Sequence, residues 1–318
     1  MVPRRPAPFR IDPAPTVVET RLAEALATAT GALDGVQPIL RHLLGATDQA
    51  LFSDRILARV RNLLHDLARQ LVAGLGVAPL DPGDGRCDAL LARLAGEPSL
   101  LAHVHALALE AALADRLDER IGLDPVVSPL LEALLAASEP ETAALAERVR
   151  AAQTRFVEAQ RRGALPLGDL PGDLLHNALA TLRAHFGAGD PVNDARAGAL
   201  ARTLRTQFVG SLDRASLLDR LIARMGPAAA AALDIADAGA AMFVTALRLG
   251  SGQDRDAAIL TTNESQVTRL ALALVASGVD PASVERQVEL LHVDAELPAG
   301  LLALRPDRAA ALLAATGR

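Results

Sequence analysis

Lysine, tryptophan and tyrosine are missing from the 318 residues of this chain, and cysteine occurs only once, at Cys87. A single cysteine cannot form a disulfide bridge within the chain, which excludes a disulfide-stabilised secreted domain and favours a reducing compartment such as the cytoplasm. The lack of lysine excludes Schiff-base chemistry and the phosphate-binding lysine of Walker-type sites. The lack of tryptophan and tyrosine disfavours pockets that stack nucleobases or sugars.

Long apolar runs and an excess of positive charge are also absent. The longest apolar runs, Leu270 to Ala276 and Pro227 to Leu233, are far shorter than the ~18–20 residues that a membrane-spanning helix needs, so no membrane span is expected. All 32 basic residues are arginine, yet the formal net charge is −6. Because nucleic-acid binding depends on neutralising phosphates, this acidic balance argues against a nucleic-acid partner.

Leucine and alanine, two strong helix formers, supply most of the hydrophobic residues, which make up 51 % of the chain. Apolar residues recur three or four positions apart in many segments, as in Ile56, Val60, Leu63, Leu67 and Leu71. This spacing places them on one face of a helix. The sequence therefore predicts an all-α fold of roughly a dozen helices, most of them about 10–20 residues long.

Acid–proline pairs recur along the chain and predict where helices begin. The acid can accept a hydrogen bond from an unpaired amide of the first turn, and proline suits the first helical position because it lacks an amide hydrogen. Asn263, followed three residues later by Gln266, predicts a variant capping box. The acid–proline pairs are Asp81-Pro82, Glu97-Pro98, Asp124-Pro125, Glu139-Pro140, Asp190-Pro191 and Asp280-Pro281.

Short loops between helices of similar length favour antiparallel helical hairpins. A short sequence match supports stacking of such hairpins, because Ala95-Gly96-Glu97-Pro98 is followed 42 residues later by Ala137-Ser138-Glu139-Pro140. That step falls within the ~40–47-residue period of two-helix solenoid repeats. The expected architecture is therefore a HEAT-like solenoid or, as the alternative, two helical sub-domains.

The segment GALPLGDLPG, residues 163–172, interrupts the helical pattern near the middle of the chain. We expect a flexible tail at 1–15, an N-terminal helical half at 16–162, a linker loop at 163–173 and a C-terminal helical half at 174–318. The tail carries Arg4, Arg5 and Arg10 among several prolines. Contact with an acidic partner is the functional alternative to a solvated tail.

No metal or cofactor site is predicted. Carboxylates share the glycine-rich segment 81–88, but Gly83 stands where a calcium loop needs its second ligand, which favours a solvated turn. His103 and His105 stand two residues apart on an expected helix, about 200° around its axis, and cannot chelate one metal. The sequence also lacks an HExxH motif and a cysteine cluster.

The acids of the motif DRLDER, namely Asp115, Asp118 and Glu119, resemble the acid pairs with which all-helical prenyl-transfer enzymes hold magnesium and diphosphate. Those enzymes need a second, facing cluster, and the sequence offers none. The interleaved Arg116 and Arg120 instead predict local ion pairs on an exposed helix face. No motif supplies a catalytic nucleophile either, so no catalytic residue is predicted.

Arg155, Arg161 and Arg162 place positive charge on the last turns of an expected helix. Complementing the helix dipole is one interpretation, since cations are favourable near a helix C-terminus. A docking patch for an acidic partner is the alternative, and these three arginines are the candidate interaction residues.

The run MFVTALRLGSGQDRDAA (242–258), the Leu-Ala-Leu helix after it and the segment GVDPASVER (278–286) resemble one bacterial family. It is a widespread family of uncharacterised all-helical proteins, described as a domain of unknown function with repeat-like helices. The resemblance covers about a quarter of the chain. It implies a helical-repeat architecture and brings no activity and no site residues.

Many capped helices without a convergent catalytic set favour a non-catalytic interaction or regulatory protein that presents a surface to a protein partner. The alternative is a helical enzyme or small-ligand-binding protein with a pocket between helices. Whether the chain is an enzyme stays open, and self-association into a homo-oligomer is a further expectation. An enclosed pocket with inward-facing polar groups would favour the alternative, and an open groove would favour the interaction protein.

Overall fold

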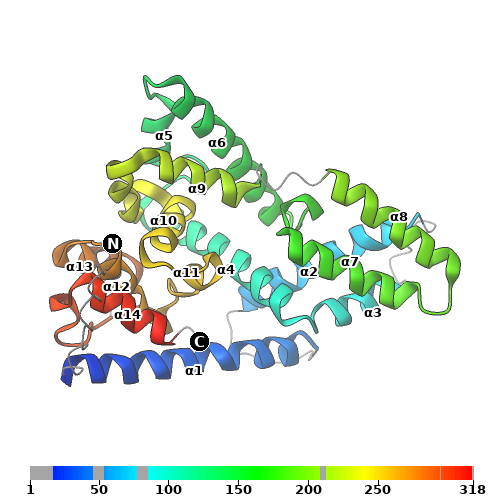
Figure 1. The fold of residues 1–318 in the computed structure, drawn as a ribbon, viewed down its shortest axis with the longest axis horizontal. Helices are drawn as coiled ribbons and strands as arrows, with labels where there is room; N and C mark the ends of the chain where they lie inside the picture. The colour runs from blue at the N-terminus through cyan, green and yellow to red at the C-terminus, as the bar shows by residue number, and fades with distance from the viewer. Residues whose placement is uncertain (1–16, 46–53, 77–84, 208–212, 294, 317–318) are drawn as a thin grey trace, which may run out of the picture.

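The computed structural model describes residues 17–45, 54–76, 85–207, 213–293 and 295–316. Over these ranges it contains fourteen α-helices, four short 3-10 helices and no strand, which confirms the predicted all-α fold (Figure 1). The α-helices are α1 (Val17–Gly45), α2 (Asp54–Gly74), α3 (Gly85–Leu94), α4 (Pro98–Ile121), α5 (Pro129–Leu135), α6 (Pro140–Arg161), α7 (Gly172–Phe186), α8 (Pro191–Gln207), α9 (Arg214–Met225), α10 (Ile235–Ser251), α11 (Arg255–Leu260), α12 (Val267–Ala276), α13 (Pro281–Leu291) and α14 (Pro306–Thr316). The 3-10 helices are η1 (Leu167–Asp169), η3 (Gly226–Leu233), η4 (Glu264–Gln266) and η5 (Leu301–Ala303).

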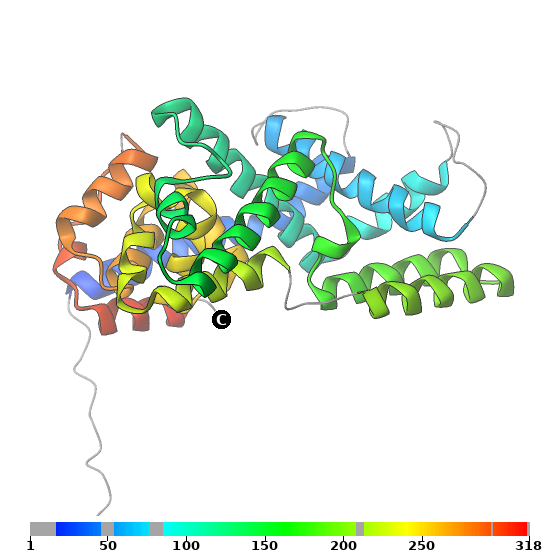
Figure 2. The same ribbon diagram turned by 90° about the horizontal axis from the view of Figure 1, so that it is seen from above.

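The buried hydrophobic residues form two clusters, which share α1, α4 and α6. The first cluster joins the start of α1, the second half of α4, α5, the first half of α6 and α9 to α14. The second joins the end of α1, α2, α3, the first half of α4, the end of α6, α7 and α8. Figure 1 shows α1 running along one edge of the molecule beneath both groups, and in Figure 2 the α7–α8 hairpin forms one end. None of the described helices combines the length and apolar composition that a membrane span requires.

Both clusters draw on residues from either side of the predicted linker. Leu175 and Leu179 pack with α2 and α3, whereas Leu145 and Val149 pack with α9 and α10. A domain boundary at 163–173, which remains a prediction, would therefore separate helices that share a core. The segment itself contains η1, and α7 begins at Gly172. The predicted tail at 1–15 lies outside the described residues.

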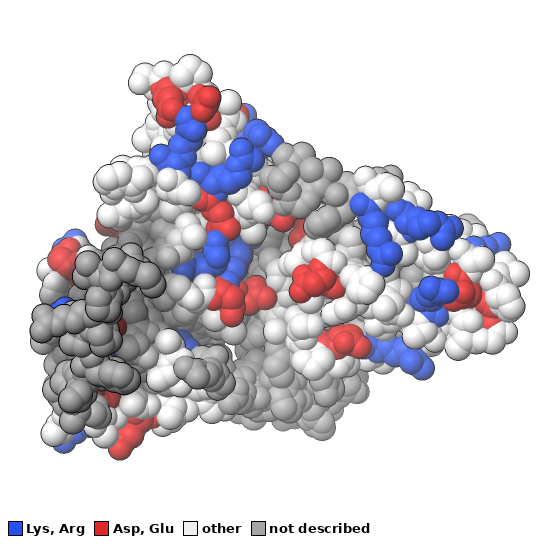
Figure 3. Space-filling model, viewed as in Figure 1, with Lys and Arg blue, Asp and Glu red and all other residues white. Residues whose placement is uncertain are grey.

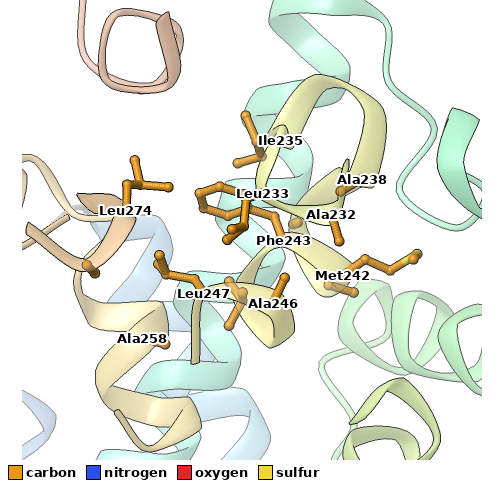
Figure 4. Packing of buried hydrophobic residues seen from close by; sticks show 14 of the residues in the cluster. Ala232, Leu233, Ile235, Ala238, Met242, Phe243, Ala246, Leu247, Ala258 and Leu274 are labelled. Carbon is orange, nitrogen blue, oxygen red and sulfur yellow. The ribbon is translucent and has the colours of Figure 1, made fainter. Parts of the chain in front are cut away.

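Small residues around Phe243 allow close packing at the centre of the first cluster. Phe243 is 0 % exposed, and Figure 4 shows it among alanine, leucine and methionine side chains from α10 and its neighbours. At Gly239, α10 is kinked with φ 68°. A Cβ there would lie 3.1 Å from Cβ of Ser128. Glycine is therefore required at this position, both for its backbone conformation and for the close approach of α10 to the start of α5.

Aspartate caps helices as predicted, but glutamate does not. Asp280 accepts a hydrogen bond from the Ser283 amide at 3.1 Å, whereas neither Glu97 nor Glu139 makes a side-chain cap bond. At α5 the cap is Ser128 rather than Asp124. The shorter aspartate and serine side chains reach the first-turn amides with less loss of conformational freedom. The Asp81-Pro82 pair lies outside the described residues.

The predicted capping box at Asn263 is wrong in its second half. The Asn263 side chain accepts a hydrogen bond from the Ser265 amide at 3.4 Å. Gln266, however, is fully buried, and its Nε2 donates to the carbonyl oxygen of Ala29 in α1 at 2.9 Å. Gln266 therefore joins α1 to the C-terminal helices instead of capping its own helix.

The two matching segments that suggest a repeat have the same local role. Glu97 and Glu139 are both extended, with φ/ψ of −85°/107° and −81°/114°, and each precedes a proline that begins a long helix. Those helices, α4 and α6, have 24 and 22 residues. Whether they belong to a solenoid repeat stays a prediction.

Candidate functional site

A pocket of about 420 Å³ lies where the two hydrophobic clusters meet. α4, α6 and the N-terminal residues of α9 and α11 line it, together with segment 164–171, α7 and α8. Most of its wall is apolar, and this part includes Leu107, Phe156, Leu165, Leu167, Leu175 and Leu204. Its polar side chains are His103, Arg155, Gln160, Asp169, Asp213, Arg214 and Arg255.

Two arginines of the pocket share one buried carboxylate. Glu110 of α4 is 1 % exposed. Its Oε1 accepts hydrogen bonds from Nη1 of Arg214 at 2.7 Å and Nη2 of Arg255 at 2.8 Å, and its Oε2 accepts from Nη2 of Arg214 at 2.7 Å. Such charge-assisted hydrogen bonds are about twice as strong as those between neutral groups, and the bidentate geometry adds specificity.

Neighbouring side chains fix the orientation of both guanidinium groups. Nη1 of Arg214 donates to Oε1 of Gln153 at 2.9 Å, and Gln153 donates in turn to the Pro125 carbonyl at 2.9 Å. The Arg214 guanidinium also lies 3.7 Å from the centre of the Phe156 ring, a cation–π contact. Nη1 of Arg255 donates to Oγ1 of Thr245 at 2.8 Å. The cluster is therefore held by α4, α6, α9, α10 and α11.

Local sequence explains where these three charges lie. Glu110 is the only formally charged residue between Pro98 and Ala114, so a helix that is apolar on all sides carries it into the core. Arg214 and Arg255 are the first residues of α9 and α11. Both helices start at an aspartate cap, since Asp213 accepts from the Ser216 amide at 2.6 Å and Asp254 from the Ala257 amide at 2.7 Å.

The shared carboxylate stays ionised although it is buried. Desolvation would raise the pKa of Glu110, but attraction and hydrogen bonding by Arg214 and Arg255 outweigh it and lower the pKa from 4.5 to about 2. Desolvation also lowers the pKa of Arg255, against the attraction of Glu110. Arginine nevertheless remains protonated at neutral pH, so these three side chains carry a net charge of +1.

Further ionisable groups lie around this cationic centre. Nδ1 of His103 lies 3.1 Å from both carboxylate oxygens of Asp256. Asp169 is exposed at the pocket, yet desolvation raises its pKa, against the attraction of Arg214 and Arg155. The pocket thus combines a fixed pair of cations with the carboxylates of Asp213, the N-cap of α9, and of Asp169.

Gln160 adds a polar atom whose hydrogen bonding is incomplete. Its side chain lines the pocket and is 6 % exposed, and its Oε1 is buried without a hydrogen-bond partner among the described residues. A buried acceptor in that state costs about 1–3 kcal/mol.

The side chains of the lining define the chemical groups that the pocket offers. No serine, threonine or cysteine belongs to the described lining of the pocket. His103, oriented by Asp256, could exchange a proton with a bound molecule. Among the described residues, no group of three or more histidine, cysteine, aspartate or glutamate side chains is arranged to hold a metal ion.

The three arginines of the predicted interaction patch are all exposed, on α6 or at its end, and Arg155 also lines the pocket. Nη1 of Arg162 lies 3.6 Å from Oε2 of Glu158. On the face shown in Figure 3, acidic and basic side chains are interspersed over much of the described surface. The role of these arginines in docking a partner stays a prediction.

The acids of the DRLDER segment make ion pairs, but the predicted local pairing with Arg116 and Arg120 is wrong, because their described partners come from another helix. Oδ2 of Asp115 accepts hydrogen bonds from Arg55 and Arg59 of α2, each at 3.0 Å. Nη1 of Arg120 donates to the Leu290 carbonyl at 2.7 Å. These contacts join α4 to α2 and α13. The calcium-like segment begins outside the described residues, and Cys87 is buried in α3.

No protein family, no curated protein and no solved structure matches the chain. The resemblance of segments 242–258 and 278–286 to a bacterial family therefore stays a prediction. The candidate site rests on its geometry, and the sequence prediction missed its centre, Glu110, Arg214 and Arg255.

Proposed function

We propose that the protein binds a small organic molecule with a carboxylate group and an apolar body in this pocket. The main support for this proposal is that Arg214 and Arg255 share the Glu110 carboxylate beside a mainly apolar wall. Their side chains are 11 % and 13 % exposed, and both belong to the pocket lining. A concave, mostly apolar site with a few fixed polar groups is the usual form of a small-molecule site.

Both guanidinium groups keep donors for a ligand. Each has five N–H donors, and the protein contacts described above use three of Arg214 and two of Arg255. A planar guanidinium matches the two oxygens of a carboxylate. The net charge of +1 on the Glu110 cluster favours an anionic group, against the carboxylates of Asp169 and Asp213, which line the same pocket.

The remaining lining sets the expected shape of the ligand. A volume of about 420 Å³ lies near the lower end of the range for drug-sized ligands. Phe156 and the surrounding leucines would hold an apolar body. We infer a molecule with one carboxylate and a hydrocarbon part.

Thermal unfolding with a panel of carboxylic acids, each paired with its uncharged amide, tests this function. Free acids should raise the melting temperature and the amides should not, because only the acids carry the negative charge that pairs with the arginines. A ligand at 100 times its Kd stabilises the folded state by about 2.7 kcal/mol. Ala215→Leu should abolish the shift, since Ala215 lines the pocket. Ala223→Leu, an exposed site on the same helix, is the matched control. Equal shifts in the two variants, or none with any acid, would refute the proposal.

A non-catalytic interaction protein is the second candidate, and exposed Arg161 and Arg162 at the end of α6 support an acidic protein partner. Charge reversal of both, R161E/R162E, should weaken binding of acidic peptides and leave the carboxylate-induced thermal shift unchanged. Self-association and a helical-repeat architecture are parts of this proposal, and light scattering tests the first. For either function we propose the cytoplasm, because the sole cysteine suits a reducing compartment.

A further inference from the structure

An open groove of about 820 Å³ lies along the end of α13, Val293 and residues 295–303. Its apolar lining includes Val293, Leu297 and Leu302, and Val293 is 63 % exposed. Three glutamates, Glu285, Glu289 and Glu296, also line it. An apolar groove with an acidic rim fits an extended occupant that carries both apolar and cationic side chains.

The three glutamates of the groove make no ion pair and no side-chain hydrogen bond with another described residue, and all three are exposed. The arginines on neighbouring elements already have partners. Arg286 donates to Oγ of Ser283 at 2.6 Å, Nε of Arg305 lies 3.2 Å from Asp307, and Nε of Arg308 donates to Glu19 at 2.8 Å. The negative charge of the groove is therefore available to pair with cationic side chains of an occupant.

The start of α1 lies directly beside this groove. A Cβ at Gly300, which lines the groove, would lie 3.0 Å from Cγ1 of Val18. The ion pair between Glu19 and Arg308 fixes the first turn of α1 against α14, and Figure 1 shows this end of α1 below α14. Residues 1–16 therefore join the described structure next to the groove.

We propose that residues 1–16 of this chain bind in the groove as an extended segment. Their sequence, MVPRRPAPFRIDPAPT, has Arg4, Arg5 and Arg10 for the three glutamates and Phe9 for the apolar floor. Its prolines favour the polyproline II conformation, with about 3.1 Å per residue. Phe9 precedes Val17 by eight residues, which gives a reach of about 25 Å. The groove would thus be the acidic partner that the sequence suggests for the arginines of residues 1–15.

Trypsin cleavage of the intact protein tests this inference. Trypsin should cut the Arg4–Arg5 and Arg10–Ile11 bonds slowly, because a bound segment cannot enter the protease. The variant E285Q/E289Q/E296Q should be cut about fourfold faster, as expected for the loss of three exposed ion pairs of a few tenths of a kcal/mol each. Raised ionic strength should have the same effect on the unmodified protein. Mass spectrometry of the released peptides gives the rates.

Two controls separate docking from its alternatives. E132Q/E147Q/E158Q removes the same charge from exposed glutamates of α5 and α6 and should leave the cleavage rate unchanged. Circular dichroism melts must show that both triple variants are folded, and Phe9→Ser gives a second route to faster cleavage with the groove intact. Equal rates for the groove variant, Phe9→Ser and the unmodified protein would overturn the proposal. Protection that grows with protein concentration alongside a dimer in light scattering would also overturn it, because the segment would then bind a second copy.

Discussion

Replacing Glu110 with glutamine should destabilise the protein strongly, because it leaves two buried guanidinium groups without a countercharge. Removing one partner of a buried ion cluster costs about 3–5 kcal/mol. The lowering of the Glu110 pKa from 4.5 to about 2 gives an independent value of about 3 kcal/mol for the preference of the folded state for the ionised form. The two routes agree, so we expect E110Q to lose about 3 kcal/mol.

Urea unfolding at neutral pH, followed by far-ultraviolet circular dichroism, measures this loss. The matched control is E119Q on the same helix, because the side chain of Glu119 is 66 % exposed and lies 3.6 Å from Arg55. An exposed pair of this kind contributes about 0–1 kcal/mol. The difference between the two variants isolates the effect of burial and of the second arginine.

The same variant should change the response to acid. Because the folded-state pKa of Glu110 lies below its unfolded value, its contribution is complete above about pH 4.5 and disappears as the pH falls towards 2. E110Q should therefore lose less stability over that interval than the unmodified protein. An E110Q variant that loses less than about 1 kcal/mol at neutral pH, or that matches the acid sensitivity of the unmodified protein, would refute this account.

Two further predictions concern a buried histidine and two glycines. Desolvation lowers the pKa of His105 from 6.5 to about 4, so the folded state loses about 3 kcal/mol as the pH falls through that interval; urea unfolding of His105→Gln should show a flatter pH dependence there. Gly239→Ala should cost more than about 1 kcal/mol, because φ is +68° and the new Cβ would meet Ser128. Gly31→Ala, within α1 with open space around it, should instead stabilise the protein by about 0.5–1 kcal/mol, and thermal unfolding distinguishes the two substitutions.

Helices were predictable because their signal is local. The stripe Ile56, Val60, Leu63, Leu67 and Leu71 is buried along α2 as expected, since a period of 3.6 residues places those side chains on one face. Which helices share a core was not predictable. α7 and α8 follow the mid-chain loop but pack with α2 and α3, and no periodicity within one helix identifies the helix opposite.

The pocket was likewise not predictable from the sequence, although its residues have unusual sequence positions. Arg214 and Arg255 lie 104 and 145 residues from Glu110, so no motif spacing joins them. Each residue nevertheless breaks a local rule: Glu110 is a lone charge in an apolar helix, and both arginines stand at helix N-termini, where the helix dipole disfavours cations. The three exceptions compensate one another. The buried Glu110 carboxylate stabilises both arginines, and the two arginines keep it ionised. Exceptions that compensate one another in this way are expected at functional sites, which is the reason to look for the ligand here first.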